Sequence, residues 1–354
     1  MDKPKEATSE QETKKNCPSR CIFCFRTEDE VSFRIEHIIP DAIGGRLKLE
    51  KYVCFDCNSW LGANVDHHIQ RVPDILTALH KIGDIERLDH ILKSNYDATL
   101  ESQSGDKFRA HADSKGFYLL PQKNSAGNII WPEKRGTEIL KKSLQRQDIN
   151  ADETCKEKEI ERICKFAENS IAGEKFIPDS IPFEFEKHSE KLKPNLVPKA
   201  LGDPNALIAK IAYEFMFFVG SARFFQVKGL AERLLEEIEP QLEKKNDVKM
   251  FINRVKSLCE EPRPYHFIRF EHHPKCPPML TVGFYGTLAY HLVIFVTLPE
   301  DFFKEIADYA NFPSMIGIQY QGGIGGNKYS SEQAFWALGP DGKSKQINDL
   351  LHYS

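Results

Sequence analysis

The fold of the N-terminal region is decided by residues 21–58, which read CIFCFRTEDEVSFRIEHIIPDAIGGRLKLEKYVCFDCN. This stretch begins and ends with a Cys-x2-Cys pair, Cys21/Cys24 and Cys54/Cys57. Each pair turns the chain so that two thiolates point at one centre, and two pairs complete the tetrahedral ligand set of zinc. We therefore predict a structural zinc site of these four cysteines. The alternative is that one pair is a redox dithiol or a pair of buried structural cysteines.

The chain has nine cysteines, and the five outside these pairs are scattered: Cys17, Cys155, Cys164, Cys259 and Cys276. An odd, scattered set without a signal peptide argues against a framework of disulfides. Cys17 is a rival zinc ligand because it precedes Cys21 by four residues, but it ranks below the two pairs.

The residues between the pairs predict a strand, a loop, a second strand and a helix. Pro40 ends the first strand, since it cannot donate to a ladder, and Gly44-Gly45 allows close backbone approach in the loop. We expect three groups of apolar side chains to be buried, those of Ile35, Ile38 and Ile39, then Leu47, Leu49 and Val53 in residues 46–55, and then Trp60, Leu61, Val65 and Ile69 at helical spacing. The core is small, so zinc would supply much of the folding energy.

Three features occur in order along this stretch: the run Glu36-His37-Ile38-Ile39-Pro40, the glycine pair, and a Cys-x2-Cys followed at once by Asn58. In this it resembles the HNH (ββα-metal) endonuclease family, over about 50 residues. The resemblance implies that His37 is the general base that activates water against a phosphodiester. It implies that Glu36 and Asn58 hold a single catalytic Mg²⁺ or Mn²⁺, which neutralises charge on the phosphate, and that the zinc is structural.

The stretch departs from the family pattern at two places. The family more often has Asp where this chain has Glu36, and it has an Asn that orients the histidine where this chain reads Leu49-Glu50-Lys51. A backbone carbonyl or Glu50 is expected to hold the His37 ring instead. If neither does, the module is a weak nuclease or a degenerate binding module, so a non-catalytic zinc-stabilised nucleic-acid-binding protein stays open as an alternative, as does an RNA nuclease.

Other polar residues near the motif have two interpretations each. Four cations either contact phosphates or are simply solvated, and the sequence favours neither interpretation: Arg34, Arg46, Lys48 and Lys51. We expect Trp60 in the core rather than stacked on a base. We expect Asp66 to support the fold, with His67 and His68 facing solvent, rather than a further metal site there.

Charge and hydropathy limit the remaining classes of protein. The net charge of –4 argues against a protein that coats nucleic acid along its whole surface, but it allows a local cleft for double-stranded DNA. The longest apolar run, residues 207–219, is interrupted by Lys210, Tyr213 and Glu214, so we expect no membrane span. With a polar N-terminus, the chain is expected to be cytoplasmic.

The expected organisation is α+β: an N-terminal zinc-stabilised ββα-metal module followed by a larger mixed α+β domain. Residues 1–16 are expected to be a disordered tail, 17–70 the HNH module, 71–198 a helical and β-hairpin linker region, and 199–354 a C-terminal α+β domain. In the last region we predict helices at 204–219, 226–238, 246–258 and 301–310 and strands at 265–271, 279–285, 289–298 and 315–320. The glycine-rich residues 321–328 are expected to be a loop, because a phosphate-binding ending is missing.

HNH nucleases with extra domains resemble bacterial restriction or anti-phage effectors. By that analogy the C-terminal domain would recognise a target, bind a regulatory ligand or protein, or form a homodimer so that two nuclease modules meet two strands.

Overall fold

The computed structural model describes residues 20–101, 107–119, 122–123, 129–130, 157–158, 185–186, 193–199, 204–239, 247–255, 259–273, 276–311, 315–325, 332–347 and 350. The chain divides into two compact units, one of residues 1–82 and 202–354 and the other of residues 83–201. Each unit is described by itself. The expected tail, Cys17 and most of the charged stretch 133–194 lie outside the described residues.

The N-terminal module, residues 20–70, has the expected order of elements. Strand β1 (Phe33–His37) pairs antiparallel with β2 (Lys48–Cys54), and a 3-10 turn η1 (Asp41–Ile43) lies between them. Helix α1 (Phe55–Leu61) then continues through a π-helical turn, η2 (Gly62–Asp66), into α2 (His67–Gln70). The strands and helix bury Ile38, Ile39, Leu47, Leu49, Val53, Leu61, Val65 and Ile69.

One strand residue is not where the sequence pattern predicts it. Ile35 is 50% exposed rather than buried, and its neighbour Glu36 is buried instead. Successive residues of a strand point to opposite faces, so with Glu36 inward Ile35 points outward. The pairing is irregular at this point, because β2 places three residues, 50–52, opposite Ile35.

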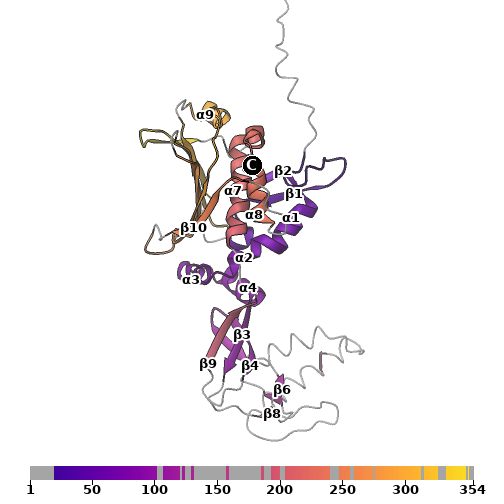
Figure 1. Cartoon of the computed structure of the whole chain (residues 1–354). Helices are drawn as coiled ribbons and strands as arrows, with labels where there is room; N and C mark the ends of the chain where they lie inside the picture. The colour runs from indigo at the N-terminus through magenta and orange to yellow at the C-terminus, as the bar shows by residue number, and fades with distance from the viewer. Residues whose placement is uncertain are drawn as a thin grey trace, which may run out of the picture. The chain divides into compact units, whose positions relative to one another are not determined.

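The larger part of this unit is a seven-stranded antiparallel sheet in the order β10-β13-β12-β11-β14-β15-β16 (Figure 1). Its strands are β10 (Met250–Val255), β11 (Tyr265–Glu271), β12 (Met279–Phe284), β13 (Leu288–Ile294), β14 (Gly317–Gly323), β15 (Gln333–Leu338) and β16 (Ser344–Ile347). The same unit also contains helices α3 (Pro73–Ile82), α8 (Leu230–Ile238) and α9 (Lys304–Ala310). The mixture of helices and strands confirms the α+β fold class.

Helix α7 (Pro204–Gly220) lies between the sheet and the N-terminal module (Figure 1). It packs against β12 and β13 on one side and against η2 and α2 on the other. Because it is covered from both sides, nearly all its residues are buried, including the polar Lys210 and Glu214. It begins at Pro204 as expected and continues into a 3-10 turn, η3 (Ser221–Gln226).

The prediction of a helix at 246–258 is wrong, because the described residues there form β10, an edge strand. Burial alternates from Met250 to Asn253, which matches the two-residue period of a strand. Strands β15 and β16 were not predicted. The glycine-rich segment is a strand up to Gly323, and the structure describes it only as far as Gly325.

The second unit begins with helix α4 (Ile85–Asn95), which leads into a four-stranded sheet ordered β5-β4-β3-β9. Its strands are β3 (Tyr96–Glu101), β4 (Lys107–Asp113), β5 (Gly116–Leu119) and β9 (Lys193–Pro198). A small core of Ala98, Leu100, Ala110 and Ala112 lies on this sheet. The short strands β6 (Gln122–Lys123), β7 (Ile129–Ile130) and β8 (Phe185–Glu186) form a separate sheet.

Within the part of the chain that the structure describes, no helix has the length and apolar character needed to cross a membrane.

Two glycines of the N-terminal module are expected to respond oppositely to alanine. A Cβ on Gly45 would lie 1.8 Å from the carbonyl oxygen of Ile39, whereas a Cβ on Gly62 meets nothing within 4 Å. We expect Gly45→Ala to lower the free energy of unfolding by about 2 kcal/mol or more. Gly62 is helical (φ –58°, ψ –41°), so Gly62→Ala should raise stability by about 1 kcal/mol. Chemical denaturation measures both, and equal effects would contradict the described loop.

Candidate functional site

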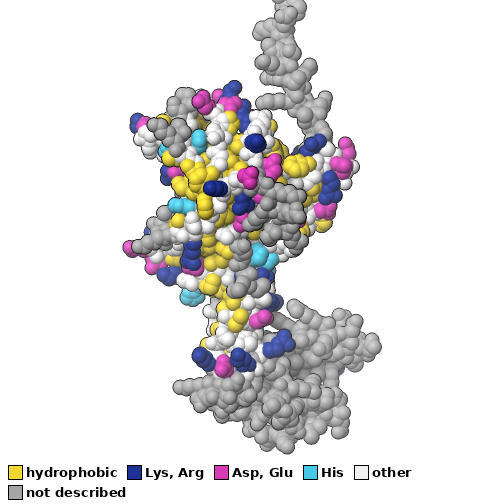
Figure 2. All heavy atoms as spheres, viewed as in Figure 1, with side chains coloured by type: hydrophobic (Ala, Val, Ile, Leu, Met, Phe, Trp, Pro, Cys, Tyr) yellow, Lys and Arg dark blue, Asp and Glu magenta, His cyan; other side chains and the backbone are white. Residues whose placement is uncertain are grey.

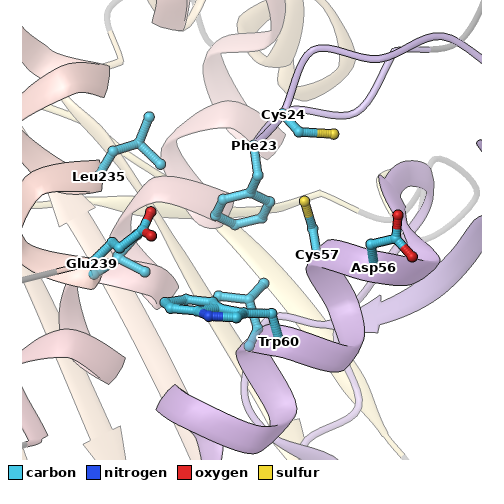
Figure 3. Close-up of a pocket in the computed structure, with 9 residues that line it drawn as sticks. Phe23, Cys24, Asp56, Cys57, Trp60, Leu235 and Glu239 are labelled. Carbon is cyan, nitrogen blue, oxygen red and sulfur yellow. The ribbon is translucent and has the colours of Figure 1, made fainter. Parts of the chain in front are cut away.

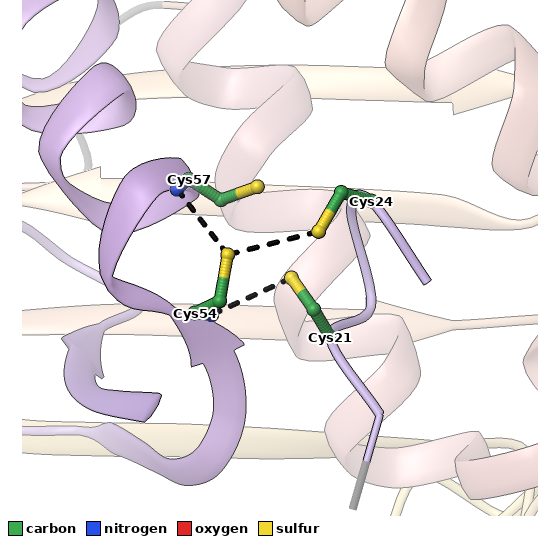
Figure 4. Close-up of side chains that lie close together, drawn as sticks. All are labelled: Cys21, Cys24, Cys54 and Cys57. Carbon is green, nitrogen blue, oxygen red and sulfur yellow. Dashed lines mark hydrogen bonds between the residues drawn. The ribbon is translucent and has the colours of Figure 1, made fainter. Parts of the chain in front are cut away.

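Four cysteines form a cluster at the start of the N-terminal module. The sulfur atoms of Cys21, Cys24, Cys54 and Cys57 all lie within 4.8 Å of one another (Figure 4). Cys24 Sγ and Cys54 Sγ are 3.7 Å apart. Tetrahedral zinc with Zn–S bonds of about 2.3 Å places its sulfurs about 3.8 Å apart, so the cluster fits a structural zinc ion.

Backbone and side-chain donors surround these sulfurs. The N–H of Cys54 donates to Cys21 Sγ (3.4 Å) and the N–H of Cys57 to Cys54 Sγ (3.5 Å). Arg26 donates to Cys24 Sγ (3.3 Å) and Cys54 Sγ (3.8 Å) and pairs with Asp56 at 2.8 Å. A hydrogen bond from Cys57 lowers the pKa of Cys21 to about 4 and raises the pKa of Cys57, so Cys21 is the first of the two thiols to ionise.

The side chain of Glu36 in β1 is in direct contact with the side chain of Asn58 in α1. Asn58 Nδ2 donates to Glu36 Oε2 (2.6 Å) and to the carbonyl oxygen of Ile35 (3.0 Å). The bulge in β2 lies opposite Ile35, whose carbonyl oxygen accepts this bond from the helix side chain. The two predicted ligands are therefore brought together, and the amide group of Asn58 faces the carboxylate with its nitrogen.

The second oxygen of Glu36 accepts from a residue that the sequence motif does not include. Lys210 Nζ of α7 lies 2.5 Å from Glu36 Oε1 and also donates to the carbonyl oxygen of His37 (2.8 Å). Two further carboxylates contact the ammonium, those of Asp66 (3.0 Å) and Glu214 (3.5 Å). Asp66 thus supports the fold, as expected, through this ion pair. The expectation that His67 faces solvent is wrong, because its Nδ1 atom is buried.

Burial and charge oppose each other in this cluster. Burial disfavours the ammonium form of Lys210, but the surrounding carboxylates outweigh burial and raise its pKa, so the side chain is charged. Burial also raises the pKa of Glu214 well above its usual value. The ammonium of Lys210, 3.5 Å away, opposes this shift only in part. The pKa of Glu36 is raised by burial too, and the short contact with Lys210 opposes that shift.

His37 occupies the half-buried end of β1. Its Nε2 lies 4.0 Å from Asp41 Oδ1, so the carboxylate that the structure brings near the ring is that of Asp41. Burial lowers the pKa of His37; the carboxylate of Asp41 opposes this shift, and the neighbouring Lys48 and Lys210 add to it. The ring is therefore neutral at neutral pH, as a general base requires.

The loop after His37 is held by the seven-stranded sheet. The carbonyl oxygen of Ile43 accepts from Tyr285 Oη (2.6 Å) and lies 2.9 Å from His266 Nε2. The Nδ1 atom of His266 accepts from the N–H of Tyr285, which places the ring proton on Nε2. Next to it, the N–H of Gly325 donates to the carbonyl oxygen of Gly44 (3.0 Å). Residues far away in the sequence thus fix the glycine loop beside His37.

The four candidate phosphate-binding cations lie in different surroundings. Lys48 is paired across the strands with His37, whereas Arg34 lies over the ring of Phe55 at 5.1 Å. Arg46 is beside Gly325 and half-buried, and Lys51 is exposed. Lys48 is thus the one of the four that the strand register sets opposite the predicted base.

The expectation that Trp60 is a core residue is wrong, because it is 38% exposed and borders a cavity of about 380 Å³. Phe23, Cys24, Asp56, Cys57, Leu61, Leu235, Ile238 and Glu239 line the same cavity. In Figure 3 the rings of Phe23 and Trp60 lie on adjacent walls of it. On α1, Trp60 and Asn58 are two residues apart and point to different sides, so this cavity is separate from the Glu36–Asn58 pair.

Residues 21–73 match the model of a protein family described as HNH endonuclease. The match covers the cysteine cluster, Glu36, His37, the glycine loop and Asn58, and it confirms the resemblance noted in the sequence. It points to a nuclease domain within these residues. No curated protein and no solved structure matches the chain.

Sequence reasoning missed Lys210, Tyr213 and Glu214 as parts of the site. Tyr213 Oη donates to the carbonyl oxygen of Ile22 at 2.5 Å, beside the first zinc-ligand pair. The signal was present, because these are the polar residues that interrupt the apolar run 207–219. Lys210 and Glu214 are four residues apart, so they lie on the same face of the helix.

We expect one zinc ion per chain, bound by the four cysteines. Cys57→Ser should lose most of its zinc and unfold at a lower temperature, because the metal contributes folding energy to a module with little core. Cys276→Ser changes an exposed cysteine outside the cluster and should keep both zinc and stability. Elemental analysis and thermal unfolding measure these effects, and full zinc content in the Cys57 variant would contradict the site.

Proposed function

We propose that this protein is an HNH endonuclease that hydrolyses DNA phosphodiester bonds, with His37 as the general base. The observation that carries the proposal is the hydrogen-bonded Glu36–Asn58 pair, with the half-buried imidazole of His37 on the next residue of the same strand. A neutral imidazole can take a proton from water as the water attacks phosphorus. The zinc cluster and the sheet hold the strand and the loop that carry this histidine.

The oxygen donors beside His37 fit the chemistry of a hard divalent cation. Glu36 and Asn58 would hold a single Mg²⁺ or Mn²⁺, and the ammonium of Lys210 on Glu36 is evidence that this carboxylate attracts a cation. When bound, the ion would neutralise charge on the scissile phosphate and the leaving oxygen. The chain's own residues supply the base, through His37, and the orientation of the ligands, through Asn58 and the strand bulge.

A local rather than global attraction for DNA agrees with the distribution of charge. On the face drawn in Figure 2, basic and acidic side chains are interspersed rather than gathered into fields of one sign. Lys48 would contact the phosphate next to His37, and Arg34, Arg46 and Lys51 would contact neighbouring phosphates. We propose double-stranded DNA as the substrate.

By resemblance, we extend the proposal to a cytoplasmic restriction or anti-phage effector. Its C-terminal domain would recognise the target or a regulatory ligand or protein, and a homodimer stays a prediction of that analogy. The second candidate function is non-catalytic, zinc-stabilised binding of nucleic acid. It is favoured by the missing Asn near Glu50. The carboxylate of Asp41, which lies near the ring of His37, is 4.0 Å away, too far for a hydrogen bond that would orient the ring.

The test is nicking of a supercoiled plasmid by zinc-replete protein with Mg²⁺ and with Mn²⁺. We expect wild-type protein to cleave and His37→Ala to lose about 10²–10⁴-fold in rate, the usual contribution of a general base. His80→Ala is the matched control, because His80 is exposed on α3.

Equal rates for His37→Ala and wild type would overturn the role of the base. Binding of DNA without cleavage, unchanged in His37→Ala, would support the non-catalytic alternative. Cleavage of RNA but not DNA would keep the base and change the substrate.

A further inference from the structure

Glu36, the residue to which the proposed function gives the divalent ion, already has a cation. Lys210 reaches it from α7, 174 residues further along the chain, at 2.5 Å. Both side chains are buried, with Lys210 0% exposed. Of the lysines that the structure describes, Lys210 is the one that belongs to the buried set, so this contact differs in kind from a surface ion pair.

The ammonium lies in an oxygen-rich cage. Besides Glu36 it contacts the carbonyl oxygen of His37 (2.8 Å) and the carboxylates of Asp66 (3.0 Å) and Glu214 (3.5 Å). Both oxygens of Glu214 are buried with no hydrogen-bond donor among the described residues. Three carboxylates around one ammonium leave an excess of acidic groups, and carboxylate and carbonyl oxygens are the ligands that hard divalent cations take.

The two proposed metal ligands face other partners in this arrangement. One oxygen of Glu36 accepts from Lys210 and the other from the amide nitrogen of Asn58. Because the amide presents its nitrogen to the carboxylate, Asn58 must turn before its oxygen can share an ion with Glu36. An ammonium and a divalent ion on the same carboxylate would also repel each other.

We propose that Lys210 is the resident cation of Glu36, and that a divalent ion binds Glu36 only by displacing the Lys210 ammonium. The inference rests on the proposed function, which assigns Glu36 to the metal. It makes Lys210 a residue that sets the affinity of the site for metal. It also couples metal binding to α7, because displacement breaks the bonds of Lys210 to β1.

The first test is the affinity of zinc-loaded, full-length protein for Mn²⁺, followed by the electron paramagnetic resonance of free Mn²⁺. Lys210→Met removes the charge and keeps an unbranched apolar chain, so the oxygens of Glu36, Asp66 and Glu214 are left for the ion. We expect this variant to bind Mn²⁺ at least tenfold more tightly than wild type. The gain should be lost in the double variant Lys210→Met, Glu36→Gln.

Lys343→Met is the matched control, because Lys343 is 82% exposed and pairs with Asp341, and it should bind Mn²⁺ as wild type does. Circular dichroism and thermal unfolding establish that each variant is folded. A folded Lys210→Met variant with wild-type affinity for Mn²⁺ would overturn the proposal.

A second test uses the unaltered chain, so it holds even if Lys210→Met does not fold. In protein labelled with ¹⁵N-lysine, a buried, ion-paired ammonium exchanges its protons slowly and gives a resolved signal, whereas exposed lysines exchange fast. We expect titration with Mg²⁺ to remove or shift this signal. A signal unchanged at the highest Mg²⁺ concentration at which the protein stays folded would overturn the displacement.

Neither readout depends on cleavage, so the two proposals can fail separately. Protein in which Mg²⁺ displaces Lys210 but which leaves DNA intact would contradict the proposed function alone. Protein that cleaves DNA, and whose Mn²⁺ affinity is the same with and without Lys210, would contradict the inference alone.

Discussion

The buried ion pair between Lys210 and Glu36 is the interaction on which the arrangement of this unit depends. Neither charge is stable alone in the interior, and removing one partner of such a pair typically costs about 3–5 kcal/mol. While this pair is formed it holds helix α7 against β1, and the other side of the helix packs against the sheet. The same ammonium holds the backbone of His37, so one contact fixes both the carboxylate and the strand that carries the base.

The N-terminal module could be predicted well from sequence because its determinants are local. The cysteine pairs, Pro40, the glycine pair and Asn58 lie within 38 consecutive residues, 21–58, and the spacing of such residues fixes a turn, a strand end or a metal knuckle directly. The family match over residues 21–73 agrees with that reading. Ile35 was misjudged because the apolar residue was assumed to face inward, whereas β1 buries the polar Glu36, whose charged partner Lys210 lies far away in the sequence.

The surroundings of the motif could not be predicted in the same way. Lys210, Tyr285 and Gly325 reach the module from α7 and the sheet, and contacts over such separations leave no periodic signal in either segment. Lys210 and Glu214 were visible only as interruptions of an apolar run, a pattern that excludes a membrane span without saying what the charges contact. The edge strand β10 was mistaken for a helix because it is only six residues long. So few residues do not distinguish the 3.6-residue period of a helix from the 2-residue period of a strand.

The distance along the chain between Glu36 and Lys210 has a consequence for biosynthesis. A ribosome adds about 5–20 residues each second, so the 174 positions between them correspond to roughly 10–35 s of translation. During that interval the nascent module can take up zinc, but its acidic residue lacks both its ammonium partner and the helix that covers it. The finished environment of Glu36 therefore arises only on chains whose synthesis has passed α7, and prematurely terminated chains carry the motif without its completed surroundings.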